Sequence, residues 1–382
     1  MRFRFDPEHD ELRQVVRHLL TESAGAADVI SRSGQPTACD ARLAAKLARE
    51  IGVYGLTVPE KFGGAGFGLP ELGVVFQEAG RAALGAPLLS PALATDLLTP
   101  DGDDAADTTI GDFLGRIAAG ELLAAAAIAE GSQGWNAVPA TTGASSSAGW
   151  SLTGVKEWVQ DGAQADLFVV TAASRDGVAL FAVEADAPGL AVEPVTTIDI
   201  SRRFARLRMD EVPAVPVGTS DAAAAVRRAR DRGLVLLSAD HVGIAQRCLE
   251  MATTWAKERE QFGQVIGSFQ AIKHKLANVR LELEAAESAC LYALWAAQEA
   301  PAELPVAARI AAHTCAEAAM LAAGENIQVH GGIGATWEHP AHVYLRRATV
   351  GRRLLADPQA LLEDLAQVIE ATIFVSTAVP AP

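Results

Sequence analysis

Residues 257–277, KEREQFGQVIGSFQAIKHKLA, are the most informative stretch of this chain. Arg259 lies three residues before an aromatic residue, Phe262, and a second aromatic–amide pair follows at Phe269-Gln270. An arginine presents a planar fork of donors that suits a phosphate, and an aromatic ring offers an apolar face beside it. The stretch therefore predicts a binding site for a phosphorylated cofactor. The alternative is one charged turn of a solvated helix with both phenylalanines in the core.

A glycine-rich motif at 328–340, QVHGGIGATWEHP, favours the cofactor interpretation. The close glycines Gly331, Gly332 and Gly334 let a backbone approach a ligand, and their N–H groups can face phosphate or ribose oxygens. A lone GGxG is more often a plain turn between helices. No strand precedes these glycines, which argues against the dinucleotide-binding turn of a βαβ unit.

Composition excludes several classes of protein. The formal net charge of −15 argues against nucleic acid or an anionic membrane surface as the main partner. No apolar run approaches the ~18–20 residues of a membrane-spanning helix, so we expect no membrane insertion. The N-terminal MRFRFDPEHDELRQ lacks the apolar core of a signal peptide, and we therefore expect a cytoplasmic protein.

The spacing of metal-binding residue types predicts no metal site. The cysteines form no CxxC motif, and the histidines near 330–342 have no HExxH or similar spacing. We expect the cysteines to be small core residues. They are Cys39, Cys248, Cys290 and Cys315.

The periodicity of apolar residues divides the chain into three parts. Residues 1–120 are predicted to be helical, with a glycine-rich turn, VPEKFGGAGFG, at 58–68. Residues 121–220 contain short β-branched runs separated by turn signals, as in a small antiparallel β domain. Residues 221–382 return to helical spacing and predict a C-terminal bundle, although 221–260 would be unusually long as one helix.

The motifs at 259–277 and 328–340 together resemble the paired C-terminal signature of flavin-dependent acyl-CoA dehydrogenases. The turn at 58–68 is similar to a loop of that family's N-terminal domain, and LTGVKEWVQDGAQADLFVVTA at 152–172 is similar to its central strand region. The resemblance covers nearly the whole chain. It implies the family's α+β fold, with an N-terminal helical domain, a small central antiparallel β domain and a C-terminal four-helix bundle.

The resemblance implies FAD as the cofactor, shared across the interfaces of an obligate oligomer that is typically a dimer of dimers. It implies that the first signature binds the pyrophosphate and adenosine half of FAD across a subunit interface. The second signature contacts the adenosine half of a flavin held mainly by the adjacent subunit, and a tryptophan lies beside the flavin ring. The corresponding residues are Arg259, Gln261, Phe262 and Gln270 for the first signature, Gln328, Gly331 and Gly332 for the second, and Trp158 for the tryptophan.

The resemblance also implies the α,β-desaturation of an acyl-CoA thioester, with an electron-transfer flavoprotein as the electron acceptor. That reaction needs a carboxylate base against the α-carbon of the thioester. The family keeps its glutamate at one of two positions, and these hold Leu355 and Gly233 here. Both usual positions of the base are therefore empty.

The residues expected around the flavin ring are also altered. The family's Thr-Glu-Pro-Gly-x-Gly-Ser segment corresponds to 129–135, so its threonine and serine become Ala129 and Trp135. Gln160 replaces the threonine two residues after Trp158. Three hydrogen-bonding positions are lost at the reactive end of the flavin, while the adenosine end is retained.

Three hypotheses follow, of which the sequence favours the first. The chain is the base-lacking partner in a heteromer, resembling the α2β2 enzymes of actinobacterial steroid or bulky acyl-CoA degradation. Alternatively, it is self-sufficient with a relocated base, Asp240, which lies two helical turns after Gly233 and whose pKa burial would raise. The other role for Asp240 is a structural hydrogen bond or interface ion pair. A scaffold that binds neither flavin nor substrate is the third hypothesis, and the retained Arg259 and Gln328 argue against it.

Overall fold

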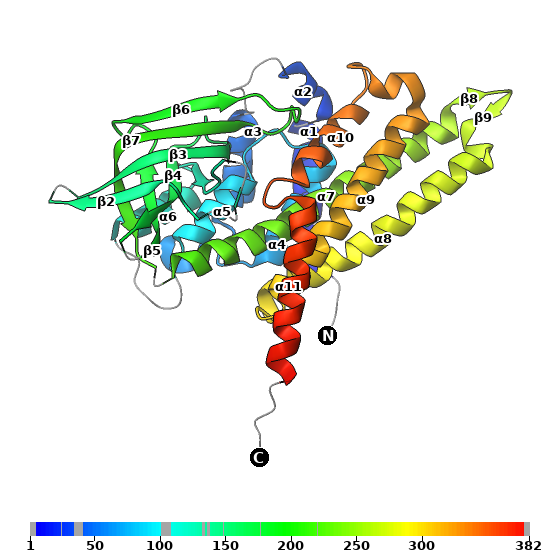
Figure 1. Cartoon of the computed structure of the whole chain (residues 1–382). Coiled ribbons are helices and arrows are strands. Elements are labelled where there is room, and N and C mark those ends of the chain that lie inside the picture. The colour runs from blue at the N-terminus through cyan, green and yellow to red at the C-terminus, as the bar shows by residue number, and fades with distance from the viewer. Residues whose placement is uncertain are drawn as a thin grey trace.

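The computed structural model has helices at both ends of the chain and a β-sheet between them (Figure 1). It describes residues 5–23, 25–33, 41–100, 108–131, 134–135, 138–147, 149–175, 177–219 and 221–377. Cys39 lies outside these ranges, and the other three cysteines are buried and form no disulfide. No helix in the described ranges has the length and apolarity that crossing a bilayer requires.

The N-terminal part is helical. The predicted glycine-rich turn at 58–68 separates its helices, and Gly63 and Gly66 within it have φ values of 84° and 66°. These left-handed conformations are readily available only to glycine, which explains the composition of the turn. The helices are α1 (Pro7–Ser23), α2 (Ala26–Ser31), α3 (Ala41–Lys46), α4 (Leu69–Ala82), α5 (Leu89–Leu98) and α6 (Thr108–Ala118), with a π-helical turn at Leu47–Ile51 and 3₁₀ turns at Val53–Gly55 and Glu60–Phe62.

The central part of the described chain forms one seven-stranded sheet. Its strands are β1 (Ala124–Ala127), β2 (Thr142–Ser146), β3 (Gly149–Gln160), β4 (Leu167–Ser174), β5 (Gly177–Glu184), β6 (Leu190–Val195) and β7 (Phe204–Val217). Most neighbouring strands pair antiparallel, as predicted, but β1 runs parallel to β4 with Ala124 opposite Leu167. All four alanines of β1 are buried, and parallel strands are usually covered on both faces in this way.

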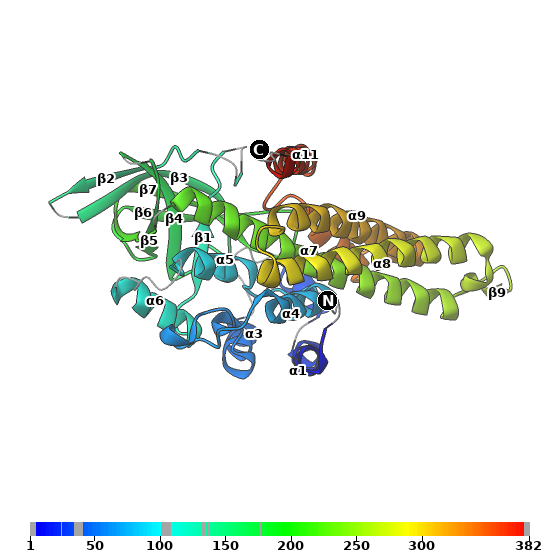
Figure 2. The same cartoon turned by 90° about the horizontal axis from the view of Figure 1, so that it is seen from below.

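The C-terminal part contains the longest helices. They are α7 (Ala222–Glu258), α8 (Gln270–Glu299), α9 (Leu304–His330), α10 (Ala341–Gly351) and α11 (Pro358–Thr377), with 3₁₀ turns at Ile266–Ser268 and Gly331–Ala335. The strands β8 (Glu260–Gln261) and β9 (Gln264–Val265) form a hairpin between α7 and α8. Helices α7, α8 and α9 lie side by side, α10 packs on α7 and α9 to complete the bundle, and α11 packs on α9 (Figures 1 and 2).

Helix α7 is unbroken over 37 residues, about 55 Å, although the sequence made so long a helix unexpected. Asp221 caps its start by accepting a hydrogen bond from the Ala224 amide at 2.9 Å. The helix contacts α4 and α5 of the N-terminal part as well as α8 and α9 of the bundle. Because different neighbours cover its successive turns, α7 is the element around which the other parts are arranged.

Two glycines bring α4 and α7 into backbone contact. A Cβ at Gly80 would lie 2.0 Å from the carbonyl oxygen of Asp240, and a Cβ at Gly243 would lie 1.9 Å from that of Gln77. Backbone atoms in two helices cannot move aside as a flexible side chain can. The close approach of the N-terminal part to α7 therefore depends on both glycines.

We expect Gly243→Ala to lower the free energy of unfolding by about 2–3 kcal/mol, because its Cβ would force α4 and α7 apart. Urea denaturation measures the change. The matched control is Gly324→Ala in α9, where an added Cβ has no atom within 4 Å. That control gains helix propensity, so it should be neutral or more stable by up to about 1 kcal/mol. Equal stabilities of Gly243→Ala and the wild type would contradict the contact.

Candidate functional site

The residues of the two signatures meet at the free end of the long helices (Figure 1). Arg259 is the C-cap of α7, the β8–β9 hairpin follows it, and Gln270 begins α8. Helix α9 ends beside them at His330. The predicted cofactor residues at this end are all exposed: Arg259, Gln261, Phe262, Gln270, Gln328, Gly331 and Gly332.

A stack of rings joins the two signatures. Trp255, one helical turn before Arg259, stacks on His330 with ring centroids 5.1 Å apart, and the ring of His339 lies 4.2 Å from that of His330. The guanidinium of Arg259 lies 5.9 Å from the Trp255 ring centroid. No carboxylate among the described residues lies within ion-pair distance of Arg259. A guanidinium left unpaired beside an aromatic ring favours a ligand over a charged helical turn.

Phe262 has a conformation that is unfavourable in an isolated chain. Its φ is 55°, and its side chain is 91% exposed. A left-handed conformation costs a non-glycine residue roughly 1–2 kcal/mol, and exposing a whole aromatic ring adds to that cost. Gly263 follows with a φ of 77°, so both central residues of the two-residue hairpin have positive φ. Strain of this kind is common where a ligand or another subunit covers the residue.

The glycine turn after α9 also presents an open backbone. Gly331 has a φ of 66°, and a Cβ at Gly331 or Gly332 would have no atom within 4 Å. Gly334 differs, because a Cβ there would lie 2.9 Å from the carbonyl oxygen of Ile327. The first two glycines thus leave backbone accessible, whereas the third permits tight packing within the turn.

Trp158 lies elsewhere in the molecule. It sits on β3, within an irregularity between Lys156 and Val159, with a φ of 55° and 52% of its surface exposed. Both views place β3 at the opposite end of the molecule from the β8–β9 hairpin (Figures 1 and 2). The predicted ring-side and adenosine-side residues therefore lie on two separate surfaces of one chain.

The two positions predicted for the catalytic base face each other. A Cβ at Gly233 would lie 2.6 Å from Cδ1 of Leu355 and 2.8 Å from Cδ2 of Leu93. Leu355 is only 4% exposed. The cavity beside it, lined by Trp135 and Trp158 among others, measures about 20 Å³. A cavity of that size holds about one water molecule rather than a flavin ring.

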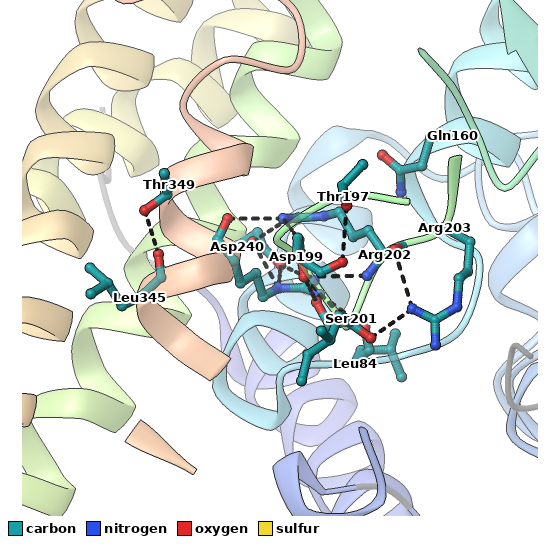
Figure 3. Close-up of polar contacts among 12 residues, drawn as sticks. Leu84, Gln160, Thr197, Asp199, Ser201, Arg202, Arg203, Asp240, Leu345 and Thr349 are labelled. Atoms are coloured by element: carbon teal, nitrogen blue, oxygen red, sulfur yellow. Dashed lines mark hydrogen bonds and ion pairs between the residues drawn. The ribbon is translucent and has the colours of Figure 1, made fainter. Parts of the chain in front are cut away.

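Asp240 is enclosed by Arg202 and Arg347, and Figure 3 shows the contact with Arg202. Its carboxylate is 1% exposed. Arg202 donates from Nη2 to Oδ2 at 2.7 Å, and Arg347 donates from Nη2 to Oδ1 at 2.5 Å. Arg347 Nε lies 3.2 Å from Oδ1 as well. Both carboxylate oxygens therefore already accept charge-assisted hydrogen bonds.

The expectation that the pKa of Asp240 is raised is wrong. Burial alone would raise it, but the charges and hydrogen bonds of Arg347 and Arg202 outweigh burial and lower the pKa below its ordinary value of 3.8. A carboxylate with a low pKa and occupied oxygens is a weak proton acceptor. These contacts support the structural role for Asp240 that the sequence left open.

The arginines connect three parts of the molecule. Arg202 lies before β7, bonds Asp199 at 3.0 Å and donates to the carbonyl oxygen of Arg347 at 3.1 Å. Arg347 in α10 donates to the carbonyl oxygen of Leu84 at 2.9 Å and to Ser201 Oγ at 2.8 Å. One buried cluster thus links the N-terminal helices, the sheet region and the bundle through Asp240.

Asp161 lies near this cluster at the end of β3. Burial raises its pKa to about 7, although a hydrogen bond from Gln160 and the charges of Arg202 and Arg347 act in the opposite direction. The Gln160 Nε2 donor lies 3.3 Å from Asp161 Oδ2. Asp161 is therefore a buried acid that titrates near neutral pH.

Glu130 lies in the segment 129–135, which corresponds to the family's flavin-ring loop. Its carboxylate accepts hydrogen bonds from the amides of Ala140 and Thr141, at 2.5 and 3.2 Å, and from Lys156 Nζ at 2.5 Å. Lys156 is fully buried, and burial lowers its pKa to about 8 despite the nearby Glu130. Glu130 has the contacts of a structural residue, because it joins the backbone of residues 140 and 141 to Lys156 of β3.

The sequence did not reveal Arg202, Arg347 or Trp255 as functional candidates. Trp255 has a usable signal, because an aromatic one helical turn before Arg259 shares its helix face. The arginines have none, since they lie 38 and 107 residues from Asp240 along the chain. No group of three or more potential metal ligands occurs among the residues that the structure describes.

Comparison with known proteins identifies the family. The model of the acyl-CoA dehydrogenase N-terminal domain matches residues 6–121, that of the middle domain matches 125–212, and that of the C-terminal domain matches 225–365. The chain belongs to the acyl-CoA dehydrogenase family. It is an oxidoreductase with the predicted α+β fold of that family, and solved structures of the same fold are named with the predicted cofactor, FAD, or with its reduced form.

Several acyl-CoA dehydrogenases are similar over nearly their whole length. Acyl-CoA dehydrogenase IpdE2 of Mycobacterium tuberculosis is 33% identical over 94% of this chain and 96% of its own length. The solved structure of a variant of the Tcur3481-Tcur3483 steroid ACAD is 30% identical, with a TM-score of 0.86, and covers 96% of this chain and 98% of its own. The ChsE4-ChsE5 complex of Mycobacterium tuberculosis is 25% identical, with a TM-score of 0.86 and full coverage of both chains.

We expect Asp240→Asn to lower the free energy of unfolding by about 3–5 kcal/mol, because it leaves Arg202 and Arg347 buried without their anion. The folded pKa of Asp240 is depressed, so its stabilisation is complete above the ordinary value of 3.8 and is lost only as pH falls through the lower folded value. The deficit measured by urea denaturation should therefore be constant between about pH 5 and pH 8. Asp210→Asn, at an exposed position on β7, is the control and should be neutral. A stable Asp240→Asn protein would contradict the importance of the cluster.

The pKa of Asp161 is shifted in the opposite direction from that of Asp240. Its folded pKa is raised, so the folded state holds the proton more tightly, and stability falls as pH rises from the ordinary value of 3.8 to about 7. The slope from this one group is at most about 1.4 kcal/mol per pH unit. Asp161→Asn keeps a neutral side chain of similar size, so it should be more stable than the wild type. This gain in the free energy of unfolding should be large near pH 8 and small near pH 5. Urea denaturation at both pH values tests this, and an equal difference at both would contradict it.

Proposed function

We propose that this chain is the base-lacking partner subunit of a heteromeric acyl-CoA dehydrogenase. A second chain of the same fold carries the glutamate that removes the α-proton during α,β-desaturation of the acyl-CoA thioester. The observation that carries the proposal is the contact of Gly233 with Leu355 and Leu93, which fills the space of the base with apolar groups.

This subunit holds the adenosine half of a flavin whose ring lies in the neighbouring subunit. FAD, when bound, accepts the hydride from the β-carbon of the acyl group. The unpaired guanidinium of Arg259, the strained and exposed Phe262 and the open backbone at Gly331 support this assignment. The residues that contact FAD are Arg259, Gln261, Phe262, Gln270, Gln328, Gly331 and Gly332.

The ring end of this chain's own cleft lacks the room for a flavin and the hydroxyl groups that the family places there. Trp135 and Leu355 line the small cavity beside Trp158, and Ala129 and Gln160 stand where the family has threonines. Trp158 then contributes to the surface of the cleft rather than to a flavin site with an adjacent base. In each pair of unlike subunits, the reactive centre accordingly lies in the partner subunit, which carries the glutamate.

The proposed assembly is a dimer of dimers with acyl-CoA as substrate and an electron-transfer flavoprotein as electron acceptor. Two similar structures are named for two chains, Tcur3481-Tcur3483 and ChsE4-ChsE5, and the first is named a steroid enzyme. These names support a heteromer and a bulky, steroid-like acyl group. The contacts of Asp240 give less support to a self-sufficient enzyme with that residue as its base, and the exposed Phe262 argues against a scaffold without flavin.

The deciding experiment compares the chain purified alone with the chain purified together with the proposed partner, a second acyl-CoA dehydrogenase-fold protein that keeps the glutamate base. We expect the chain alone to lack a flavin spectrum and turnover, and the pair to be yellow and active with an acyl-CoA and an artificial electron acceptor. A yellow, active protein from this chain alone would overturn the partner-subunit proposal and restore a relocated base.

Within the active pair, we expect Arg259→Met in this chain to weaken FAD binding at least about tenfold, because it removes charge-assisted hydrogen bonds to the pyrophosphate. Flavin titration of the flavin-free pair measures the change. Arg280→Met is the matched control, since Arg280 is exposed on α8 and pairs with Glu284 of its own helix. Unchanged affinity in Arg259→Met would remove this residue from the FAD site.

A further inference from the structure

A second cavity, of about 360 Å³, lies between the sheet and helices α7, α9 and α11. It has the volume of a small-molecule site, in contrast to the space of about 20 Å³ beside Leu355. Trp135 contributes to the lining of both cavities. Room for a ligand therefore exists in this chain outside the proposed flavin site.

The two walls of the larger cavity differ in chemistry. The apolar wall consists of Ile128, Trp135, Val138, Val178 and Val226. The opposite wall carries Arg227, Arg230, Arg309 and Asp364. A ligand that fits both walls has an apolar body and a negatively charged group.

The basic wall has fewer acceptors than donors. Arg230 and Arg309 are 6% and 7% exposed, and both donate to the same oxygen, Asp364 Oδ2, at 3.0 and 2.9 Å. Arg309 also donates to Asp231 at 2.9 Å. Arg230 Nη2 is buried without a hydrogen-bond partner among the described residues, a situation that costs roughly 1–3 kcal/mol or more.

Arg227 adds a third positive charge at the rim. Its side chain is 68% exposed, and its ion pair with Asp221 is at the limit of 4.0 Å, so this pair neutralises it weakly. On the sheet side, the Thr171 hydroxyl accepts a hydrogen bond from Lys156 at 2.9 Å and keeps its own proton to donate. The polar groups around the cavity are therefore predominantly donors.

We propose that this cavity binds an apolar molecule that carries one carboxylate. Arg230 and Arg309 share the partly exposed Asp364, Arg309 also binds Asp231, and Asp221 pairs only weakly with Arg227. The described residues of the wall therefore lack an acceptor for Arg230 Nη2, which one carboxylate would supply. The carboxylate lies at Arg230 and Arg227, and the apolar body lies against Trp135. Such a ligand joins the sheet to the bundle, and its site requires neither flavin nor a partner subunit.

Isothermal titration of the full chain with decanoate tests the proposal, with 1-decanol as the uncharged analogue and decanoyl-CoA as the thioester. We expect decanoate to bind and decanol to bind at least about tenfold more weakly, because the alcohol forms no charge-assisted hydrogen bond. Arg230→Met should weaken decanoate binding by a similar factor. Arg208→Met, at an exposed position paired with Glu193, is the control and should not change it.

Two further variants keep the test decisive if Arg230→Met does not fold. Arg227→Met changes only the exposed rim and should also weaken decanoate binding, and Val226→Trp should block the cavity without changing its charge. Three results would each overturn the proposal: no binding of decanoate, equal binding of decanoate and decanol, or binding of decanoyl-CoA alone. The last result would make the cavity part of the path of the thioester.

Discussion

The carboxylate of Asp240, held between Arg202 and Arg347, is the interaction on which the arrangement of this protein depends. A buried charge is expensive unless it is paired and hydrogen-bonded, so the three side chains are tolerated only together. Their backbones belong to α7, to the segment before β7 and to α10. Arg347 also reaches the carbonyl oxygen of Leu84 after α4. The cluster around this one carboxylate therefore fixes the positions of three segments around α7.

The backbones of α4 and α7 also meet at the turn of α7 that contains Asp240. Gly80 meets the backbone of Asp240 itself, so the ion cluster and the glycine contact hold α4 and α7 at one place. Two turns earlier, Gly233 meets Leu355 and Leu93 at the position where the family has its base. A rigid junction beside an apolar contact leaves little space for a flavin ring or a thioester. The proposed loss of catalysis in this chain follows from packing as well as from the missing glutamate.

The β8–β9 end of the long helices and the region between the sheet and the helices differ in what they can bind. The free end of the long helices exposes an aromatic residue in a strained conformation, which is costly in an isolated chain, and an arginine that has no ionic partner among the described residues. The cleft between sheet and helices is filled by Trp135 and leucines. These features suit a subunit that completes a cofactor site of its neighbour. The cavity lined by Arg230 is a separate feature, since it relies on charged side chains of α7, α9 and α11.

The amino-acid sequence by itself determined the fold class and the order of helical and β parts, because these depend on local periodicity, and it predicted the cofactor end of the site from contiguous motifs such as 257–277 and 328–340. It also showed that the two base positions hold Gly233 and Leu355. Only the tertiary structure decided that these two residues touch, that β1 pairs in parallel with β4, and that α7 runs unbroken. It also reversed the expected pKa shift of Asp240, because burial can be inferred from an apolar helix but the arginines that neutralise the charge come from distant parts of the chain.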